Sequence, residues 1–429
     1  MTSEAPQECF VWIWLPDAAK PVIAGRLERA GEQFLFNYGR SYLERPDAIA
    51  IYEPELPLQP GIQPPPPGMR LASSIRDGAP DAWGRRVIIN RTFGRRRGAI
   101  DIEALDEMTY LLESGSDRIG ALDFQRSPST YEPRELKAAS LDELAKAAEL
   151  VEAGTPLPAA LDAALFHGSS IGGARPKALI DTRTAKFIAK FPAATDTLNL
   201  VKAEFVAMRL AGHAGLNVAA VQLTRAAGKD VLLVERFDRT RTGRHWLRKS
   251  VVSALTLFEL DEMMARYASY ETLCEIIRHR FENPAATLRE LYGRLIFNIL
   301  CGNTDDHARN HAAFWDGRTL TLSPAYDICP QNRAGNAASQ AMLITGDTNA
   351  SQLSLCIDAA PNFLLRANEA TSIIERQIEV IRGDFAAVCD EAGLTTIDRK
   401  QLRERQYLNP FVFEGAPASL RKLGQKPLT

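Results

Sequence analysis

Two aspartates and an asparagine late in the sequence constrain the fold more than any other feature. Asp305 stands five residues before Asn310, and Asp327 follows 17 residues after that asparagine. Phosphoryl transfer on a kinase-like fold needs these groups in this order: one carboxylate orients the attacking hydroxyl, while an amide and a second carboxylate hold Mg²⁺ on the ATP phosphates. We therefore assign Asp305 to catalysis and Asn310 and Asp327 to the metal. The alternative is a polar loop in which Asx side chains stabilise turns.

Length and composition set the class of protein. The 429 residues exceed one ordinary domain, so two or three units are expected. A net charge of −2 gives no global electrostatic footprint for nucleic acid. The six cysteines form no CxxC pair, which favours reduced thiols in a cytoplasm over zinc or disulfides. The polar, acidic N-terminus is unlike a signal peptide, and the sequence has no apolar run of 18 residues, so no membrane span is expected.

Hydrophobic periodicity predicts an α+β chain in three parts: a β-rich subdomain over 1–130, a lobe with a hairpin over 131–240, and an all-α lobe over 241–429. The proline-rich stretch 57–68 is expected to be an extended connection that joins no ladder. The sequence after about residue 240 is expected to be mostly helical, with one short strand at 319–322. The predicted elements elsewhere are strands at 10–15, 120–124 and 231–235, hairpins at 25–38 and 178–191, and helices at 101–113, 198–212 and 289–301.

A glycine pair before the second hairpin suggests a phosphate-binding loop. Adjacent glycines let a backbone approach a ligand closely, and successive amides can cradle phosphate oxygens. The spacing is not that of a Walker A motif, and a purely structural Gly-Gly turn is the alternative. The candidate residues are Ile171, Gly172, Gly173, Ala174, Arg175 and Lys177.

The strand after this loop offers a phosphate-binding lysine. Lys190 is our candidate, with Lys186 on the same strand face as its competitor, and Glu204 on the following helix is the residue expected to orient Lys190. The backbone of Glu235 and Phe237 is expected to form hydrogen bonds with adenine. The alternative is an ordinary transition from a strand to a loop, which would have the same sequence pattern.

His307, two residues after Asp305, is assigned a supporting role rather than that of a general base, because phosphoryl transfer depends mainly on positioning and charge neutralisation. Basic residues gather at 95–97 and 239–249. We interpret both runs as solvated faces, with binding of an acidic partner, or of DNA within an assembly, as the alternative.

Together these stretches resemble the HipA family of toxin kinases from bacterial toxin–antitoxin modules. The resemblance covers nearly the whole chain, and the matches at 303–310 and 169–177 are the most specific. The motifs are DGAPDAWGRR (77–86), SGSDRIGALDF (114–124), SSIGGARPK (169–177), KFIAKFP (186–192), VERFDR (234–239), NTDDHARN (303–310) and SPAYDI (323–328).

The resemblance implies a two-lobed protein-kinase-like fold and a serine/threonine kinase that uses ATP and Mg²⁺. It also implies autophosphorylation in the phosphate loop, at Ser170 or the adjacent Ser169, which would eject the loop. The implied partners are a HipB-like helix-turn-helix antitoxin, DNA only through that antitoxin, and a protein substrate such as an aminoacyl-tRNA synthetase. One departure from the family is the pair Asp305 and Asp306, where a single acidic residue is common. Asp305 is preferred because only it has the five-residue spacing to Asn310.

Two other functions remain open on the sequence. A small-molecule phosphotransferase would share the two aspartates and the asparagine but would need no N-terminal subdomain of this kind. A catalytically idle co-repressor would act with an antitoxin, although the intact site residues argue against it. The tail at 410–429 matches nothing that we can interpret.

Overall fold

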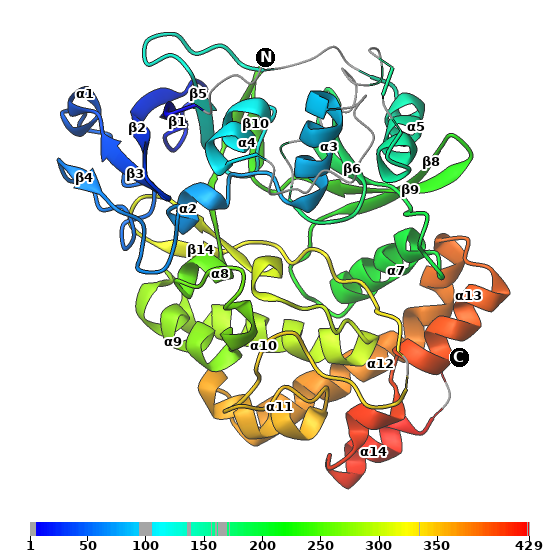
Figure 1. The fold of residues 1–429 in the computed structure, drawn as a ribbon. Helices are drawn as coiled ribbons and strands as arrows, with labels where there is room; N and C mark the ends of the chain where they lie inside the picture. Colours follow the sequence, from blue (N-terminus) through cyan, green and yellow to red (C-terminus); the bar gives the residue numbers. More distant parts are fainter. Residues whose placement is uncertain are drawn as a thin grey trace. The chain divides into compact units, whose positions relative to one another are not determined.

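The computed structural model describes residues 6–93, 105–134, 139–155, 157–158, 161, 170, 172–333, 335–426 and 428. The chain divides into two compact units (Figure 1). The first comprises Met1–Thr195, Thr224–Val252 and Phe314–Arg318, and the second comprises Asp196–Leu223, Ser253–Ala313 and Thr319–Thr429. Helices and strands are mixed, as the predicted α+β class requires. None of the helices in the described ranges combines the length and the apolar character that crossing a bilayer would need.

The first unit begins with an antiparallel sheet of order β4-β3-β2-β1-β5. Its apolar face packs on short helices, with Val11, Leu27, Phe36 and Phe124 fully or almost fully buried in the core. These elements are β1 (Glu8–Ile13), β2 (Val22–Ala30), β3 (Gln33–Tyr38), α1 (Arg40–Leu43), β4 (Ile62–Gln63), α2 (Ser73–Arg76), α4 (Glu107–Glu113) and β5 (Leu122–Gln125).

The expectation that residues 57–68 join no ladder is wrong at one point. Ile62 and Gln63, which interrupt the prolines, pair with Asn37 and Phe36 of β3 and form the edge strand β4. Both residues have the backbone N–H that proline lacks, and an edge strand needs pairing on one side only. The part of the helix expected at 101–104 lies outside the described residues.

A second sheet of the first unit has the order β6-β7-β9-β8. Figure 1 shows helices α3 and α5 lying over this sheet, and their apolar residues share a core with Ala178, Ala189 and Val231. Helix α5 starts with a capping box, in which Ser140 and Glu143 each accept the other's backbone N–H. These elements are α3 (Ala82–Phe93), α5 (Leu141–Glu152), β6 (Lys177–Asp181), β7 (Lys186–Lys190), β8 (Val221–Ala226) and β9 (Lys229–Glu235).

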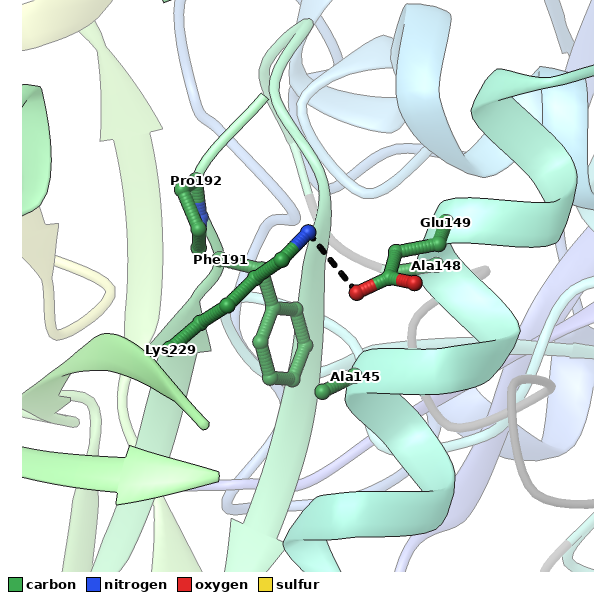
Figure 2. Close-up of a pocket in the computed structure, with 6 residues that line it drawn as sticks. All are labelled: Ala145, Ala148, Glu149, Phe191, Pro192 and Lys229. Atoms are coloured by element: carbon green, nitrogen blue, oxygen red, sulfur yellow. Dashed lines mark ion pairs between the residues drawn. The ribbon is translucent and has the colours of Figure 1, made fainter. Parts of the chain in front are cut away.

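A shallow surface hollow lies beside α5 (Figure 2). Across it, Lys229 Nζ pairs with Glu149 Oε1 at 2.8 Å. Phe191 also lines the hollow and belongs to the core under α5. No candidate site residue lines the hollow.

Helix does not follow directly after residue 240, contrary to expectation. Residues 239–253 form the strands β10 (Arg239–Thr242), β11 (His245–Arg248) and β12 (Ser250–Ser253). The first two are an antiparallel hairpin in which Thr240 faces Leu247 and Arg241 faces Trp246. Threonine and tryptophan favour a pleated surface, so the charge of this stretch obscured a strand pattern.

The second unit is mainly helical and is built around α10 (Pro284–Cys301), which is buried along most of its length. Helices α9, α11 and α12 pack against it. The other elements are α7 (Leu200–His213), α8 (Ala254–Leu257), η3 (Ala265–Tyr267), α9 (Tyr270–Arg280), η4 (Ala308–Asn310), β14 (Leu320–Leu322), α11 (Leu353–Ala359), η5 (Ala360–Phe363), α12 (Ala367–Glu391), α13 (Thr396–Gln401), η6 (Leu402–Gln406), η7 (Pro410–Phe413) and α14 (Ala418–Gly424). Strand β13 (Ala312–Trp315) begins in the second unit and ends in the first.

Candidate active site

The loop that carries Asp305 begins where α10 ends, at Gly302. This residue has φ +76°, and a Cβ there would lie 2.9 Å from the carbonyl oxygen of Gln406, so only glycine fits. The next residue is anchored to the helix twice: Asn303 N donates to Asn298 O at 2.8 Å, and Asn303 Nδ2 donates to Asn298 Oδ1 at 3.0 Å. The buried helix thus fixes the entry of the loop.

Asp305 and Asn310 are tied together by their own turn. Asn310 Nδ2 donates to the backbone oxygen of Asp305 at 3.0 Å, and the backbone N–H of His307 donates to the same oxygen at 2.9 Å. The amide nitrogen of Asn310 is therefore used inside the loop, which orients the side-chain oxygen away from this bond. Asp305 is an exposed residue, although its carboxyl group is partly shielded from solvent. The five-residue spacing thus brings the two residues together.

Asp306 has the opposite environment and is only 2% exposed. Its carboxylate pairs with His311 Nε2 at 3.0 Å and accepts a hydrogen bond from the hydroxyl of Tyr270. Burial raises the pKa of Asp306, but the opposing effects of His311, Tyr270 and Asn298 outweigh it and hold the pKa below its usual value. This carboxylate is therefore a buried anchor of the loop, which distinguishes it from its exposed neighbour.

The charge of Asp327 acts on the carboxyl group of Asp305. Burial raises the pKa of Asp305; His307 lowers it, while the charges of Asp327 and Asp306 raise it further, and the net shift is upward. A charge acts on a neighbouring carboxyl in this way mainly at short range. The charges of Asp305 and Asp327, both in the second unit, therefore act on each other.

Asp327 follows a segment, 323–326, that hydrogen bonds hold in place. Ala325 N donates to Asn217 O at 2.8 Å, and Arg294 Nη2 donates to Ser323 O at 2.9 Å. Tyr326 Oη donates to Arg309 O at 2.6 Å, which joins this segment to the loop of Asn310. Asp327 itself has φ +58°, a left-handed conformation that aspartate and asparagine tolerate better than most residues.

His307 lies two residues after Asp305 in this loop. Its Nδ1 is buried, and no described residue forms a hydrogen bond with that atom. The electrostatic effect of His307 lowers the pKa of Asp305. The supporting role expected of His307 from the sequence stays a prediction.

The predicted phosphate loop belongs to the first unit. Gly173 N donates to Asp81 Oδ2 at 2.6 Å, and Lys177 Nζ donates to Gly172 O at 2.6 Å. Ala174 is exposed and Arg175 is half-buried. Ser170 is buried, and its hydroxyl donates to the backbone oxygen of Asp117 at 3.2 Å. Ser169 and Ile171 lie outside the described residues.

The two candidate lysines differ in their ion pairs. Lys190 of β7 lies directly opposite Lys177 of β6, so both stand on the sheet face that α3 and α5 leave uncovered. Lys186 is bound to two carboxylates, Asp117 at 2.7 Å and Asp181 at 2.5 Å, which disfavours it as the phosphate ligand. Glu204 is buried on α7 of the second unit, so its predicted pairing with Lys190 of the first unit stays a prediction.

The segment predicted to meet adenine is fixed by a buried ionic network that the sequence did not reveal. Arg236 pairs with Asp117 at 3.0 Å and with Asp238 at 2.8 Å, and Arg239 pairs with the same two carboxylates, each at 2.8 Å. The network surrounds Phe237, whose ring packs edge-on against Phe314 with centroids 5.8 Å apart. Glu235 is half-buried at the end of β9.

One of the two basic runs is only partly a solvated face, because Arg241, Arg244 and Lys249 are exposed. Arg239 is only 6% exposed, and Arg248 stacks on Trp14 with its guanidinium carbon 3.5 Å from the ring centroid. The prediction is wrong for these two residues, because an arginine that pairs with a distant carboxylate or packs on an aromatic ring looks the same in sequence as an arginine in water. The other run, at 95–97, lies outside the described residues.

Asn310 and Asp327 fit a magnesium ion by their chemistry. Both present side-chain oxygens, and Mg²⁺ prefers oxygen ligands, commonly one or two protein groups with phosphate and water completing the octahedron. Among the residues that the structure describes, no group of three or more His, Cys, Asp or Glu is placed to hold a metal. An all-protein metal cage is thus not what the described residues offer, whereas a shared site with phosphates is compatible with them.

Comparison with known proteins identifies the family of the chain. Residues 169–385 match the HipA-like C-terminal domain, and residues 16–125 match the HipA N-terminal domain. The chain is 30% identical over 151 residues to the protein Y4mE of Sinorhizobium fredii, covering 33% of each, and 29% identical over 147 residues to the serine/threonine-protein kinase toxin HipA of Shewanella oneidensis, covering 30% of this chain and 34% of that protein. The matched segments thus span about a third of the length of these relatives.

The fold is shared more widely than the sequence. The solved structure of Shewanella oneidensis HipA, determined with HipB and operator DNA, superposes with a TM-score of 0.65 at 20% identity, over 91% of this chain and 95% of that chain. The predicted kinase-like fold is thereby confirmed.

Proposed function

Because the chain belongs to the HipA family, we propose that it is a serine/threonine-protein kinase that transfers the γ-phosphate of Mg-ATP to a protein hydroxyl. The observation that carries the proposal is the arrangement in the second unit, where Asn310 is bonded to the backbone of Asp305 and the charge of Asp327 raises the pKa of the Asp305 carboxyl. An exposed aspartate beside an amide and a second carboxylate is the minimum that phosphoryl transfer needs from the protein.

Each candidate site residue of the second unit has a role in this proposal. Asp305, exposed and set between His307 and Asp327, orients the acceptor hydroxyl and takes its proton. Asn310 and Asp327 would hold Mg²⁺, which supplies charge neutralisation on the phosphates when bound. His307 holds the loop and moderates the negative charge around Asp305.

The first unit would supply the nucleotide-binding residues. Lys190 and Lys177, opposite each other on the uncovered sheet face, would neutralise phosphate oxygens, and amides of the loop 171–175 would donate to them. Glu204 would orient Lys190. The backbone of Glu235 and Phe237, which the arginine network fixes, would meet adenine.

We further propose that the chain is the toxin of a toxin–antitoxin module in the cytoplasm. The support is its family and its fold likeness to HipA in a complex with HipB and operator DNA. The partner would then be a HipB-like antitoxin, with DNA bound only through it, and the protein substrate would be an aminoacyl-tRNA synthetase. The same likeness favours a second function, that of an idle co-repressor of such an antitoxin.

Regulation by autophosphorylation is part of the proposal. Ser170 is buried and its hydroxyl is bonded to Asp117 O, so modification would require the loop to leave this position. A phosphoserine carries about two negative charges, which its buried position would not accommodate without rearrangement.

Transfer of labelled γ-phosphate from Mg-ATP tests the function. We would compare wild type, Asp305→Ala, Ser170→Ala and the control Glu379→Ala, an exposed carboxylate on α12. Label on wild type and the control, lost in Asp305→Ala and Ser170→Ala, supports the kinase with Ser170 as acceptor. Loss of label only in Asp305→Ala would support kinase activity but show that a residue other than Ser170 accepts the phosphate. If wild type binds ATP but neither labels itself nor phosphorylates any member of a synthetase panel, the co-repressor function is favoured instead.

A further inference from the structure

The phosphate loop is docked on the first turn of α3 through one residue. Gly173 N donates to Asp81 Oδ2 at 2.6 Å, while Gly173 O accepts the backbone N–H of Trp83 at 3.1 Å. Asp81 directly precedes α3, and its backbone oxygen accepts Arg85 N at 2.9 Å, as an N-cap residue does. Its carboxylate, of the type that commonly caps a helix, binds the loop.

A second set of contacts, made by Trp83 and Lys177, also holds the loop. The indole of Trp83, fully buried, donates to Lys177 O at 2.9 Å, and Lys177 Nζ donates back to Gly172 O at 2.6 Å. Gly173 has φ +97°, and a Cβ there would lie 2.3 Å from Lys177 Nζ. On Gly172 a Cβ would lie 3.0 Å from Asp81 Oδ2. Gly173 thus has a backbone conformation that favours glycine, and both glycines leave room for the side chains that hold the loop.

We propose that Asp81 is a positioning residue of the nucleotide site: its carboxylate clamps the Gly173 amide and thereby fixes the loop that faces the phosphates. This inference rests on the proposed function and changes one part of it. The Gly173 amide serves the clamp, so the phosphates are bound by the neighbouring amides and by Lys177.

The Asp81 carboxylate could either hold the loop or occupy the place of a bound phosphate, and the contact between Asp81 and Gly173 favours the first role. The Gly173 peptide uses both its donor and its acceptor on the start of α3, a two-point attachment that fixes orientation as well as position. The positive end of the 12-residue helix α3 also stabilises a carboxylate at its start, so the negative charge of Asp81 is matched within the protein. A carboxylate that merely occupied the place of a phosphate would need only the first of these bonds.

Hydrogen exchange without nucleotide tests the clamp directly. In the full chain, Asp81→Ala should speed amide exchange of the loop segment 170–178 by about tenfold, because a hydrogen bond to a charged acceptor is lost. Asp81→Asn keeps an acceptor oxygen and should stay within about threefold of wild type. Asp106→Ala is the matched control, since Asp106 caps α4 by accepting Thr109 N at 2.7 Å. Unchanged loop exchange in Asp81→Ala would overturn the proposal.

Calorimetric titration with Mg-ATP then tests the consequence for binding. Asp81→Ala should weaken binding by about tenfold, which is about 1.4 kcal/mol, while Asp81→Asn and Asp106→Ala should stay within about threefold. Tighter binding by Asp81→Asn would show that the carboxylate competes with phosphate, and would also overturn the clamp. Failure of wild type to bind Mg-ATP would reject the proposed function, whereas the exchange experiment would still decide whether Asp81 holds the loop.

Discussion

Replacing Asp306 by alanine should destabilise the protein far more than replacing Asp305. Asp306 is 2% exposed, and its partners Tyr270 and His311 are 0% and 3% exposed. The substitution leaves the Tyr270 hydroxyl and His311 Nε2 buried without their acceptor, at about 1–3 kcal/mol each. The sum, about 2–6 kcal/mol, spans the cost of about 3–5 kcal/mol for breaking a buried ion pair.

Asp305→Ala is the matched comparison on the adjacent residue. Asp305 is an exposed residue, so we expect a change in unfolding free energy within about 0.5 kcal/mol. The sign should be stabilising at neutral pH, because the raised pKa of Asp305 means that its ionised form is disfavoured in the folded state. Phosphate transfer should show the reverse order: lost in Asp305→Ala, and retained by the fraction of Asp306→Ala that remains folded.

Urea unfolding at pH 7, with transfer measured on the same preparations, provides the assay. The pKa of Asp306 is lowered by folding, so its contribution is present above the unfolded value of about 3.9 and is lost as pH falls through the folded value. The difference in unfolding free energy between Asp306→Ala and wild type should therefore become smaller below about pH 4. If Asp306→Ala were as stable as wild type but inactive, Asp306 and not Asp305 would be the catalytic aspartate.

Three other predictions follow from single contacts. Asp327→Asn should keep the left-handed backbone and a melting temperature near that of wild type, yet reduce Mg-dependent transfer by at least about 10²-fold in a steady-state assay. Gly302→Ala should lower the unfolding free energy by about 1–3 kcal/mol in urea, because its Cβ would meet Gln406 O; an unchanged midpoint would refute the steric argument. Acid titration followed by circular dichroism should show the protein losing stability below about pH 4, since folding lowers the pKa of Asp117 and Asp238 and that stabilisation is lost as pH falls through their folded values.

Spacing along the chain was sufficient to select the residues of the candidate site. Asp305, Asn310 and Asp327 are separated by short segments whose geometry is set locally, by a glycine at the end of a helix and by a three-residue turn. The fold class could be predicted for the same reason, because apolar periodicity reports burial within one element. The choice of Asp305 over Asp306 used spacing alone, and the burial of Asp306 by Tyr270 and His311 gives it an independent physical basis.

Contacts between distant segments could not be predicted. Arg236 and Arg239 are buried because Asp117, more than a hundred residues earlier, neutralises them. Asp81 reaches Gly173 across 92 residues, and nothing in either segment indicates the other. The edge strand at Ile62 was missed because an edge strand needs a partner on one side only, and that partner, β3, lies well upstream.

The most direct test of the proposed kinase is single-turnover transfer of γ-phosphate by wild type and Asp305→Asn, with and without a chelator of Mg²⁺. Asparagine keeps the size and exposure of the side chain and removes only its charge and basicity. The account predicts Mg-dependent transfer by wild type and a loss of at least about 10²-fold in Asp305→Asn, with Mg-ATP binding preserved. Equal transfer rates in the two proteins would contradict the central claim that Asp305 is the catalytic residue.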